Sequence, residues 1–200
     1  GKLLHEYEVN DFFERYHASL RCLMRSELID LLREGLGNCP IRMGTTVEAL
    51  DQAGGEVQAT FSDGSKGTFD LVVGCDGLHS RVRKLLFGQV PVNFTGWAGW
   101  AWWLNPQIAP HDAITEYWGA GRFFGIYPSK GRLCCFVGMP AEEHAPDPAE
   151  TRIARIRENF GHLGGDVPQI LAALELPEDI YYTDYSDLKM DRWQRGRVLH

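Results

Sequence analysis

The chain has 200 residues, of which 44% are hydrophobic and 24% are charged, as in ordinary globular proteins. This composition excludes collagen, coiled coil and intrinsic disorder, and the length allows one domain, or two small ones, with a real hydrophobic core. Acidic residues exceed basic ones by 27 − 20 = 7, and no Lys/Arg-rich run occurs. Because such a chain repels phosphate backbones, no nucleic-acid partner is expected.

The cysteines are odd in number and include no CxxC pair. This pattern argues against a disulfide framework and against a zinc site, and it favours a reduced, cytoplasmic protein. No apolar stretch approaches the roughly 20 residues of a membrane-spanning helix, so no membrane span is expected. The chain starts at Gly1 rather than Met and stops within the strand-like residues 197–200. We therefore expect a fragment of a longer protein.

The N-terminal elements are expected to be short. Residues 2–7 suggest a strand and residues 8–18 a connection. Ser26 is a candidate N-cap of the helix that follows, with acidic residues in its first turns. Leucines at helical spacing predict that one face of this helix is apolar. They are Leu28, Leu31, Leu32 and Leu36.

From residue 45 the pattern changes to a period of two. Gly54-Gly55 and Asp63-Gly64 separate alternating stretches and predict tight turns between strands. Residues 71–75 are apolar without alternation, which predicts a short strand buried on both faces. Asp76-Gly77 ends this strand, and Ser80 can cap the basic helix that follows.

Residues 92–139 carry most of the aromatic side chains, in four strand-like runs separated by turn residues. We predict that residues 92–139 and 180–188 form a largely antiparallel sheet, covered by helices at residues 151–160 and 167–174. The predicted fold class is therefore α+β. Trp residues occupy both parities of residues 97–103, so one sheet face is expected to pack on the helices while the other is available to a ligand.

Motifs of self-contained chemistry are absent from the 200 residues. GxGxxG, a P-loop, GxSxG and HExxH do not occur, and the seven histidines show no metal-ligand spacing. No catalytic residue and no metal site are assigned.

The informative stretch is residues 70–83, where the strand ends at Asp76-Gly77 and a helix begins with Ser80 and two arginines. Such a turn can bind an anion, although an ordinary strand–turn–helix accounts equally well for it.

Residues 70–83 resemble the Asp-Gly motif of the FAD-dependent aromatic hydroxylases, the single-component flavin monooxygenases related to para-hydroxybenzoate hydroxylase. Residues 25–32 are similar to the family's R-x-x-L-x-x-x-L segment, and residues 45–51 to a strand near the adenine. Residues 95–103 and 124–128 resemble the substrate-domain sheet of the salicylate-hydroxylase and epoxidase branches. Residues 193–200 look like the entry to a further fingerprint. The resemblance covers nearly the whole chain.

The resemblance implies that Arg25, Val47, Asp76 and Gly77 contact FAD. It also implies that NADH or NADPH reduces the flavin and that one oxygen atom of O2 enters an aromatic or unsaturated hydrophobic substrate. Because the cofactor supplies this chemistry, no catalytic dyad is needed. The aromatic strands suit a dry substrate pocket, with these candidate substrate-binding residues: Trp100, Trp102, Phe124 and Tyr127. For any one aromatic residue, plain core packing is the competing explanation.

The expected domain ranges follow from the same resemblance. Residues 1–20 are a substrate-domain strand and connection, residues 21–90 part of the FAD-binding domain, residues 91–190 the substrate-binding domain, and residues 191–200 the return to the FAD-binding domain. The family's GxGxxG unit and Gly-Asp motif lie outside the sequence, and Cys75 stands where Ala is usual. The fragment alone is therefore expected to be inactive and free of FAD, and to self-associate through apolar surface.

Two other functions remain open. A non-redox binding module could stack a planar ligand on the Trp-rich sheet, although the Asp-Gly turn and Arg25 would then have no role. A flavin-dependent halogenase or reductase could share the same fold.

Overall fold

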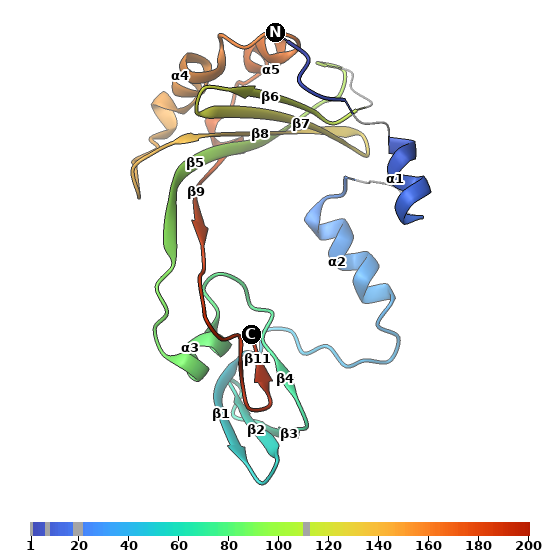
Figure 1. Ribbon diagram of the computed structural model, residues 1–200, viewed down its shortest axis with the longest axis vertical. Helices are drawn as coiled ribbons and strands as arrows, with labels where there is room; N and C mark the ends of the chain where they lie inside the picture. The colour runs from blue at the N-terminus through green and yellow to red at the C-terminus, as the bar shows by residue number, and fades with distance from the viewer. Residues whose placement is uncertain (1, 7–8, 18–21, 110–112) are drawn as a thin grey trace. The chain divides into compact units, whose positions relative to one another are not determined.

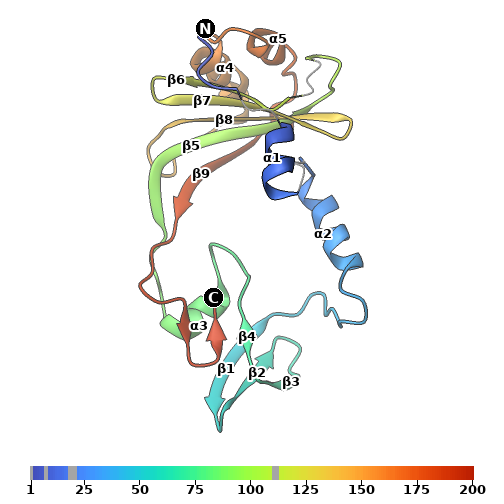
Figure 2. The same ribbon diagram turned by 45° about the vertical axis from the view of Figure 1, so that its right-hand side comes forward.

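The computed structural model describes residues 2–6, 9–17, 22–109 and 113–200. They form two compact units (Figures 1 and 2). Unit 1 comprises Gly1–Gly37 and Gly96–Tyr185, and unit 2 comprises Asn38–Thr95 and Ser186–His200. The sequence-based domain ranges stay predictions; residues 21–37, expected in the FAD-binding part, belong to unit 1.

Unit 1 is built on a five-stranded sheet in the order β6-β7-β8-β5-β9. The neighbours β6 and β7, β7 and β8, and β8 and β5 pair antiparallel. Helices α4 and α5 cover one face of this sheet in both views (Figures 1 and 2). The predicted α+β fold is confirmed. The strands are β5 (Asn93–Leu104), β6 (Thr115–Gly119), β7 (Arg122–Ser129), β8 (Arg132–Pro140) and β9 (Tyr181–Asp187); the helices are α4 (Ala149–Phe160), α5 (Val167–Ala172) and the 3-10 helix η1 (Pro177–Asp179).

The hydrophobic core of unit 1 lies between the sheet and these helices. Alternate residues of β5, β7 and β8 point into it, because successive side chains of a strand face opposite sides. Helical residues one turn apart complete the core from α4 and α5. The fully buried large side chains are Trp100, Trp102, Phe124, Ile126, Leu133, Val137, Ile156, Phe160, Val167 and Ile170.

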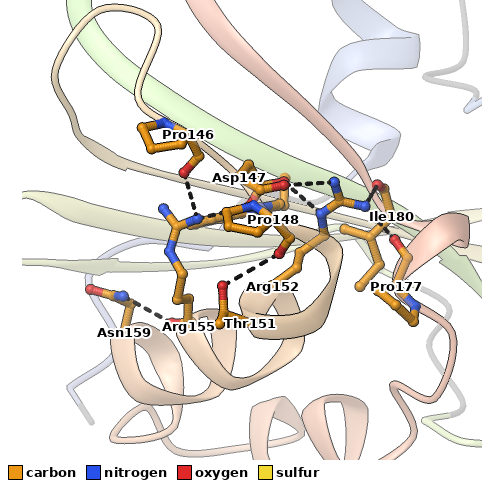
Figure 3. A network of polar contacts seen from close by, with 10 residues as sticks. Pro146, Asp147, Pro148, Thr151, Arg152, Arg155, Asn159, Pro177 and Ile180 are labelled. Carbon is orange, nitrogen blue, oxygen red and sulfur yellow. Dashed lines mark hydrogen bonds and ion pairs between the residues drawn. The ribbon is translucent and has the colours of Figure 1, made fainter.

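A polar network fastens α4 to the sheet (Figure 3). The side chain of Asp147, 5% exposed, accepts hydrogen bonds from Arg152 Nε at 2.5 Å and Arg155 NH1 at 2.9 Å. Trp100 Nε1 on β5 donates to the same carboxylate at 3.1 Å. Arg152 also donates to the carbonyl oxygens of Pro177, the first residue of η1, and Ile180, which lies between η1 and β9. One buried carboxylate thus joins the loop before α4, the helix and the sheet.

Unit 2 contains two small three-stranded sheets. The first, β1 (Val47–Ala53), β2 (Glu56–Phe61) and β3 (Lys66–Phe69), is antiparallel, and the turns predicted at Gly54-Gly55 and Asp63-Gly64 connect its strands. The second pairs β4 (Val72–Val73) in parallel with β11 (Val198–Leu199), which pairs antiparallel with β10 (Gln194–Arg195). Helix α3 (Arg81–Phe87) closes a core formed by Val57, Val82, Leu86 and Val198.

The N-terminal prediction is wrong in two places. Residues 2–6 form no strand, and Tyr7 lies outside the described residues. The expected connection at residues 8–18 contains helix α1 (Val9–Tyr16). Its apolar residues Val9, Phe12, Phe13 and Tyr16 recur at three- to four-residue spacing, which is the helical signal that an interpretation from polarity overlooks.

Helix α2 (Arg25–Glu34) is confirmed as a helix, but its start and its packing differ from expectation. Met24, not Ser26, is the N-cap residue, and the Glu27 carboxylate accepts a hydrogen bond from the Met24 N–H at 3.0 Å. No residue of α2 is buried, so the leucine stripe is exposed within the described chain. An amphipathic pattern predicts an apolar face but does not supply its partner.

The strand expected at residues 71–75 is shorter and more exposed than predicted. Only Val72 and Val73 form β4, which is an edge strand with β11 as its sole neighbour among the described residues. The Val73 residue is 56% exposed. Among the helices that the structure describes, none is long and apolar enough to cross a membrane.

Candidate functional site

The Asp76-Gly77 turn of unit 2 is separated from the end of β4 by two residues. Gly77 has φ +79°, a conformation that favours glycine, and a Cβ there would meet open space. Upstream, Gly74 lies against Val82, where a Cβ would come within 2.6 Å of the valine Cβ. The missing side chain at residue 74 therefore lets the chain pack closely against α3, and the backbone of residue 77 is open to the surroundings.

Asp76 orders the start of α3. Its Oδ1 accepts from Ser80 Oγ at 2.5 Å, and its Oδ2 accepts from the backbone N–H groups of Arg81 at 2.7 Å and Val82 at 3.1 Å. Desolvation by burial acts to raise the pKa of Asp76, but these hydrogen bonds outweigh it and hold the pKa below its ordinary value. Ser80 caps the helix as predicted, accepting from the Arg83 N–H at 2.9 Å. Most of the hydrogen-bonding capacity of the Asp76 carboxylate is thus used at the helix N-terminus.

Arg83 supports the turn by hydrogen bonds to its backbone carbonyl groups. This arginine is 5% exposed, and its guanidinium donates to the carbonyl oxygens of Gly77 at 3.5 Å and Leu78 at 2.5 Å. Its NH1 also lies 3.4 Å from Nε2 of His200. A buried cation bonded to carbonyl oxygens fixes the path of residues 77–78. Arg83 was not among the residues that the sequence singled out for the cofactor.

His200 directly follows β11. The Arg83 guanidinium contacts both His200 and the Asp-Gly turn. Its ring stacks on Trp193 with centroids 5.7 Å apart, and its backbone N–H donates to the Trp193 carbonyl at 2.9 Å. The His200 Nδ1 atom is buried, and no hydrogen-bond partner for it occurs in the part of the chain that the structure describes. A buried polar atom without a partner is costly, so this position suits a ligand that brings one.

The other two expected cofactor residues lie elsewhere in the chain. Val47 is the half-buried first residue of the edge strand β1 in unit 2, paired with Phe61 beside an irregularity in the register. Arg25 is the exposed first residue of α2 in unit 1. If Arg25 and Asp76 both contact FAD, as the resemblance implies, they are expected to lie near one another; they belong to different units, and this expectation stays a prediction.

Unit 1 presents a second candidate site on the face of the sheet opposite α4 and α5. We call it the aromatic face; it is defined by the alternate residues that do not point into the core. It consists of Trp97, Gly99, Ala101 and Trp103 on β5, Glu116 and Trp118 on β6, Phe123, Gly125, Tyr127 and Ser129 on β7, Arg132, Cys134, Phe136, Gly138 and Pro140 on β8, and Tyr185 on β9.

Three glycines form the floor of the aromatic face. A Cβ on Gly99 would collide with the phenol of Tyr185, and one on Gly138 would collide with the Phe123 ring and lie 3.1 Å from the Tyr185 ring. A Cβ on Gly125 would collide with the ring of Tyr127. Because glycine has no side chain, the Phe123 and Tyr185 rings can lie over neighbouring strands, and the Tyr127 ring can lie back along its own strand.

A row of rings therefore crosses the sheet. Trp118 stacks on Phe123 at 5.8 Å between centroids, Phe123 meets Phe136 at 5.2 Å, and Phe136 meets Tyr185 at 5.7 Å. The Tyr185 hydroxyl donates to the Val137 carbonyl at 3.1 Å, which holds the ring in place, and burial raises the pKa of Tyr185. The row is an apolar surface against which an aromatic molecule can pack, with Trp118 and Phe123 stacked and Phe123 and Phe136 edge to face.

A polar cluster lies at the β6 end of this row. The Glu116 carboxylate accepts from the Tyr127 hydroxyl at 2.5 Å and from Trp118 Nε1 at 3.1 Å. Burial, followed by the hydrogen bond to Glu116 and its charge, raises the pKa of Tyr127, so the phenol keeps its proton and donates.

Of the four candidate substrate residues, only Tyr127 lies on the aromatic face. Trp100, Trp102 and Phe124 are 1%, 2% and 0% exposed and pack against α4 and α5. Their position is that of core residues, so the expected substrate contact stays a prediction that this packing does not support. Because tryptophans alternate along β5, composition alone did not separate the two faces.

Sequence reasoning missed the residues that build the aromatic face. Phe123, Phe136 and Tyr185 were assigned to strands but given no role. A usable signal was present: an isolated glycine inside a strand often marks a close approach by another group, and Gly99, Gly125 and Gly138 are three of these. Reading them together with their register would have identified the face.

Residues 10–199 match the FAD binding domain family. The chain belongs to this family. It is 25% identical over 203 residues to the FAD-dependent urate hydroxylase of Klebsiella pneumoniae, covering 99% of this chain and 53% of that protein. It is also 25% identical over 183 residues to the 2-heptyl-3-hydroxy-4(1H)-quinolone synthase of Pseudomonas aeruginosa, covering 88% and 47%. The chain spans about half the length of the curated relatives that it matches.

Solved structures agree. Klebsiella pneumoniae HpxO complexed with FAD and uric acid superposes with a TM-score of 0.83 at 25% identity, covering 96% of this chain and 51% of that one. A salicylate hydroxylase substrate complex has the same fold at a TM-score of 0.68 and 21% identity, covering 88% and 49%. The resemblance to FAD-dependent hydroxylases inferred from the sequence is confirmed at the level of family and fold.

Unit 2 fits part of an FAD molecule. In sheets with parallel strands, ligands bind beyond the carboxyl ends of the strands, and both the Asp-Gly turn and His200 follow the carboxyl ends of the parallel pair β4 and β11. The open backbone at Gly77 and the buried Nδ1 of His200 are groups that a polar ligand satisfies. Asp76 retains acceptor capacity on Oδ1, since it accepts one hydrogen bond there.

Proposed function

We propose that the chain is part of an FAD-dependent monooxygenase that uses NADH or NADPH and transfers one oxygen atom of O2 to an aromatic or unsaturated hydrophobic substrate. The observation that carries the proposal is the aromatic face, a row of rings over a glycine floor, in a chain of the FAD binding domain family. FAD, when bound, supplies the electron transfer and the activation of O2. The protein has to hold the substrate ring and exclude water.

The residues of this chain divide these tasks. The turn at Asp76 and Gly77, supported by Arg83, and the orphan Nδ1 of His200 would contact FAD. Phe123, Phe136 and Tyr185 would contact the substrate ring, because they offer apolar aromatic area that an aromatic molecule can bury. Trp118 and Trp103, both exposed, would extend this area at its edges. Roles for Arg25 and Val47 at FAD belong to the same proposal.

The test uses the whole protein loaded with FAD. Oxidation of NADH and of NADPH is followed with and without added small aromatic compounds, under labelled oxygen gas. We expect an aromatic compound to accelerate the oxidation and to gain one labelled oxygen atom. A halogenated product formed in the presence of halide would instead identify a halogenase, and ring binding without flavin absorbance would identify a binding module; either result overturns the proposal.

The five cysteines are free thiols in the structure, and we propose a reducing, cytoplasmic location on that basis.

The exposed leucine stripe of α2 leads us to propose self-association of the 200-residue chain. Light scattering should show an average mass that rises with concentration, and Leu32→Lys should lower it. A monomeric chain at all concentrations would contradict this expectation.

A further inference from the structure

We propose that Glu116 determines which aromatic substrates bind: its carboxylate receives a hydrogen-bond donor on the substrate, and it disfavours aromatic carboxylates. The inference rests on the proposed use of the aromatic face for substrate. It assigns the substrate class as a planar apolar ring system that carries an O–H, an N–H or a protonated amine.

The Glu116 carboxylate is oriented by the protein and is only partly used. Each of its oxygens accepts one hydrogen bond, from the Tyr127 hydroxyl and from Trp118 Nε1. A carboxylate offers about four acceptor positions, so about two remain for a ligand. Both donors are themselves members of the aromatic face, which places the remaining acceptor positions beside the row of rings.

The backbone explains how Tyr127 reaches this carboxylate. Gly125 is the register partner of Glu116 across β6 and β7. The Tyr127 ring lies over Gly125, where a Cβ would come within 2.4 Å of the ring. The absence of a side chain at residue 125 is therefore what lets the Tyr127 ring lie back along β7 and reach Glu116 on β6. The arrangement fixes the carboxylate before any ligand arrives, which reduces the entropy lost on binding.

The cationic side chain on the β5–β8 part of the aromatic face belongs to a residue away from Glu116 along the strands. That residue is Arg132, at the turn between β7 and β8, where it pairs with Ser129. Ser129 is four residues along β7 from Gly125, which is about 13 Å at the rise of a strand. An anionic substrate lying on the row of rings would thus meet a negative charge at one end, whereas a donor would find acceptors there.

The test measures binding of three naphthalenes that share one ring system to the 200-residue chain by equilibrium dialysis. They are 2-naphthylmethylamine, 2-naphthalenemethanol and 2-naphthoate. We expect the amine to bind tightest and the carboxylate weakest, with about a tenfold ratio between these two. Glu116→Gln should remove most of this ratio, and Glu116→Asp, which keeps the charge, should retain part of it. Glu150→Gln, on α4, is the matched control and should leave the ratio unchanged.

Near-UV circular dichroism checks that each variant keeps the packing of its aromatic side chains. Equal affinity for the amine and the carboxylate, or a ratio that survives Glu116→Gln in a folded variant, would overturn the inference. Because dialysis requires neither FAD nor turnover, this result is independent of the oxygen-transfer assay. A failure of the proposed monooxygenase activity is therefore distinguishable from a failure of the assignment of Glu116.

Discussion

Asp76 shows how a residue that resembles a cofactor ligand also stabilises its own turn. Its carboxylate is bonded to Ser80 and to two backbone N–H groups at the start of α3. These N–H groups have no partner within the helix, and a negative charge near a helix N-terminus is favourable. Any contact with a ligand has to be added to these bonds. A substitution at residue 76 consequently affects folding as well as binding.

We expect Asp76→Asn to lower the free energy of unfolding by about 1 kcal/mol at neutral pH, as for the loss of a helix cap. The folded-state pKa of Asp76 lies below its ordinary value, so its contribution is present above the unfolded pKa near 4 and is lost as the pH falls through the folded pKa. Urea unfolding of both proteins between pH 7 and pH 2 should show the difference shrinking in acid. A difference that is constant with pH would contradict this account.

Gly138 is a second residue at which a single side chain decides local structure. A Cβ at this position would lie 2.5 Å from Phe123 Cε1 and 3.1 Å from Tyr185 Cε2. We expect Gly138→Ala to displace these rings and to cost about 1–3 kcal/mol, as for other overpacked positions. Chemical denaturation measures the cost, and near-UV circular dichroism reports on the rings. Gly119→Ala is the control, because its Cβ would meet nothing closer than the Arg122 carbonyl at 3.9 Å.

At the scale of elements, Asp147 determines how α4 attaches to the sheet. Its buried carboxylate is shared by Arg152, Arg155 and Trp100 (Figure 3). Removing one member of a buried ion pair leaves the others with uncompensated charge. A loop residue therefore holds together a helix and a strand that are far apart in the sequence.

We expect Asp147→Ala to lower the free energy of unfolding by about 3 kcal/mol, because both guanidinium groups and the Trp100 N–H lose their shared acceptor. Thermal and urea unfolding followed by circular dichroism measure the loss. Glu150→Gln, in the first turn of α4, changes an exposed charge and should cost a few tenths of a kcal/mol, roughly. Equal effects of the two substitutions would show that the network does not hold α4.

At the scale of the whole molecule, the 200 residues divide into two units with separate cores. The turn that suits FAD lies in unit 2 and the aromatic face in unit 1. The FAD binding domain family match runs through both units. Under the proposed function, unit 2 would hold part of the cofactor and unit 1 the substrate.

We expect the 200-residue chain, produced by itself, to bind FAD with a dissociation constant of about a millimolar or weaker. A pyrophosphate normally binds at a glycine-rich turn and the helix behind it, and no GxGxxG occurs in these residues. Losing several kcal/mol of such binding weakens affinity by a factor of about ten for each 1.4 kcal/mol. Titration of flavin fluorescence tests this expectation; saturation at low micromolar FAD would contradict it.

Much of the fold follows from local signals in the sequence. Alternation and turn glycines determine the antiparallel strands, and helical spacing determines α4 and α5, because these patterns act through nearby residues. The Asp-Gly turn and the Ser80 cap are equally local, since their hydrogen bonds join residues within six positions of one another. The family could be recognised for the same reason, as its motifs are continuous segments.

Tertiary structure decided the rest. Trp100 and Trp103 look alike in the sequence. Trp100 is buried because α4 and α5 pack on its side of the sheet, whereas Trp103 points to the other side and is exposed. Tyr185 and Gly99 are 86 positions apart, and Glu116 and Tyr127 meet only because β6 and β7 pair in one register. Which side of a strand becomes core depends on what covers it, and this is a property of distant segments.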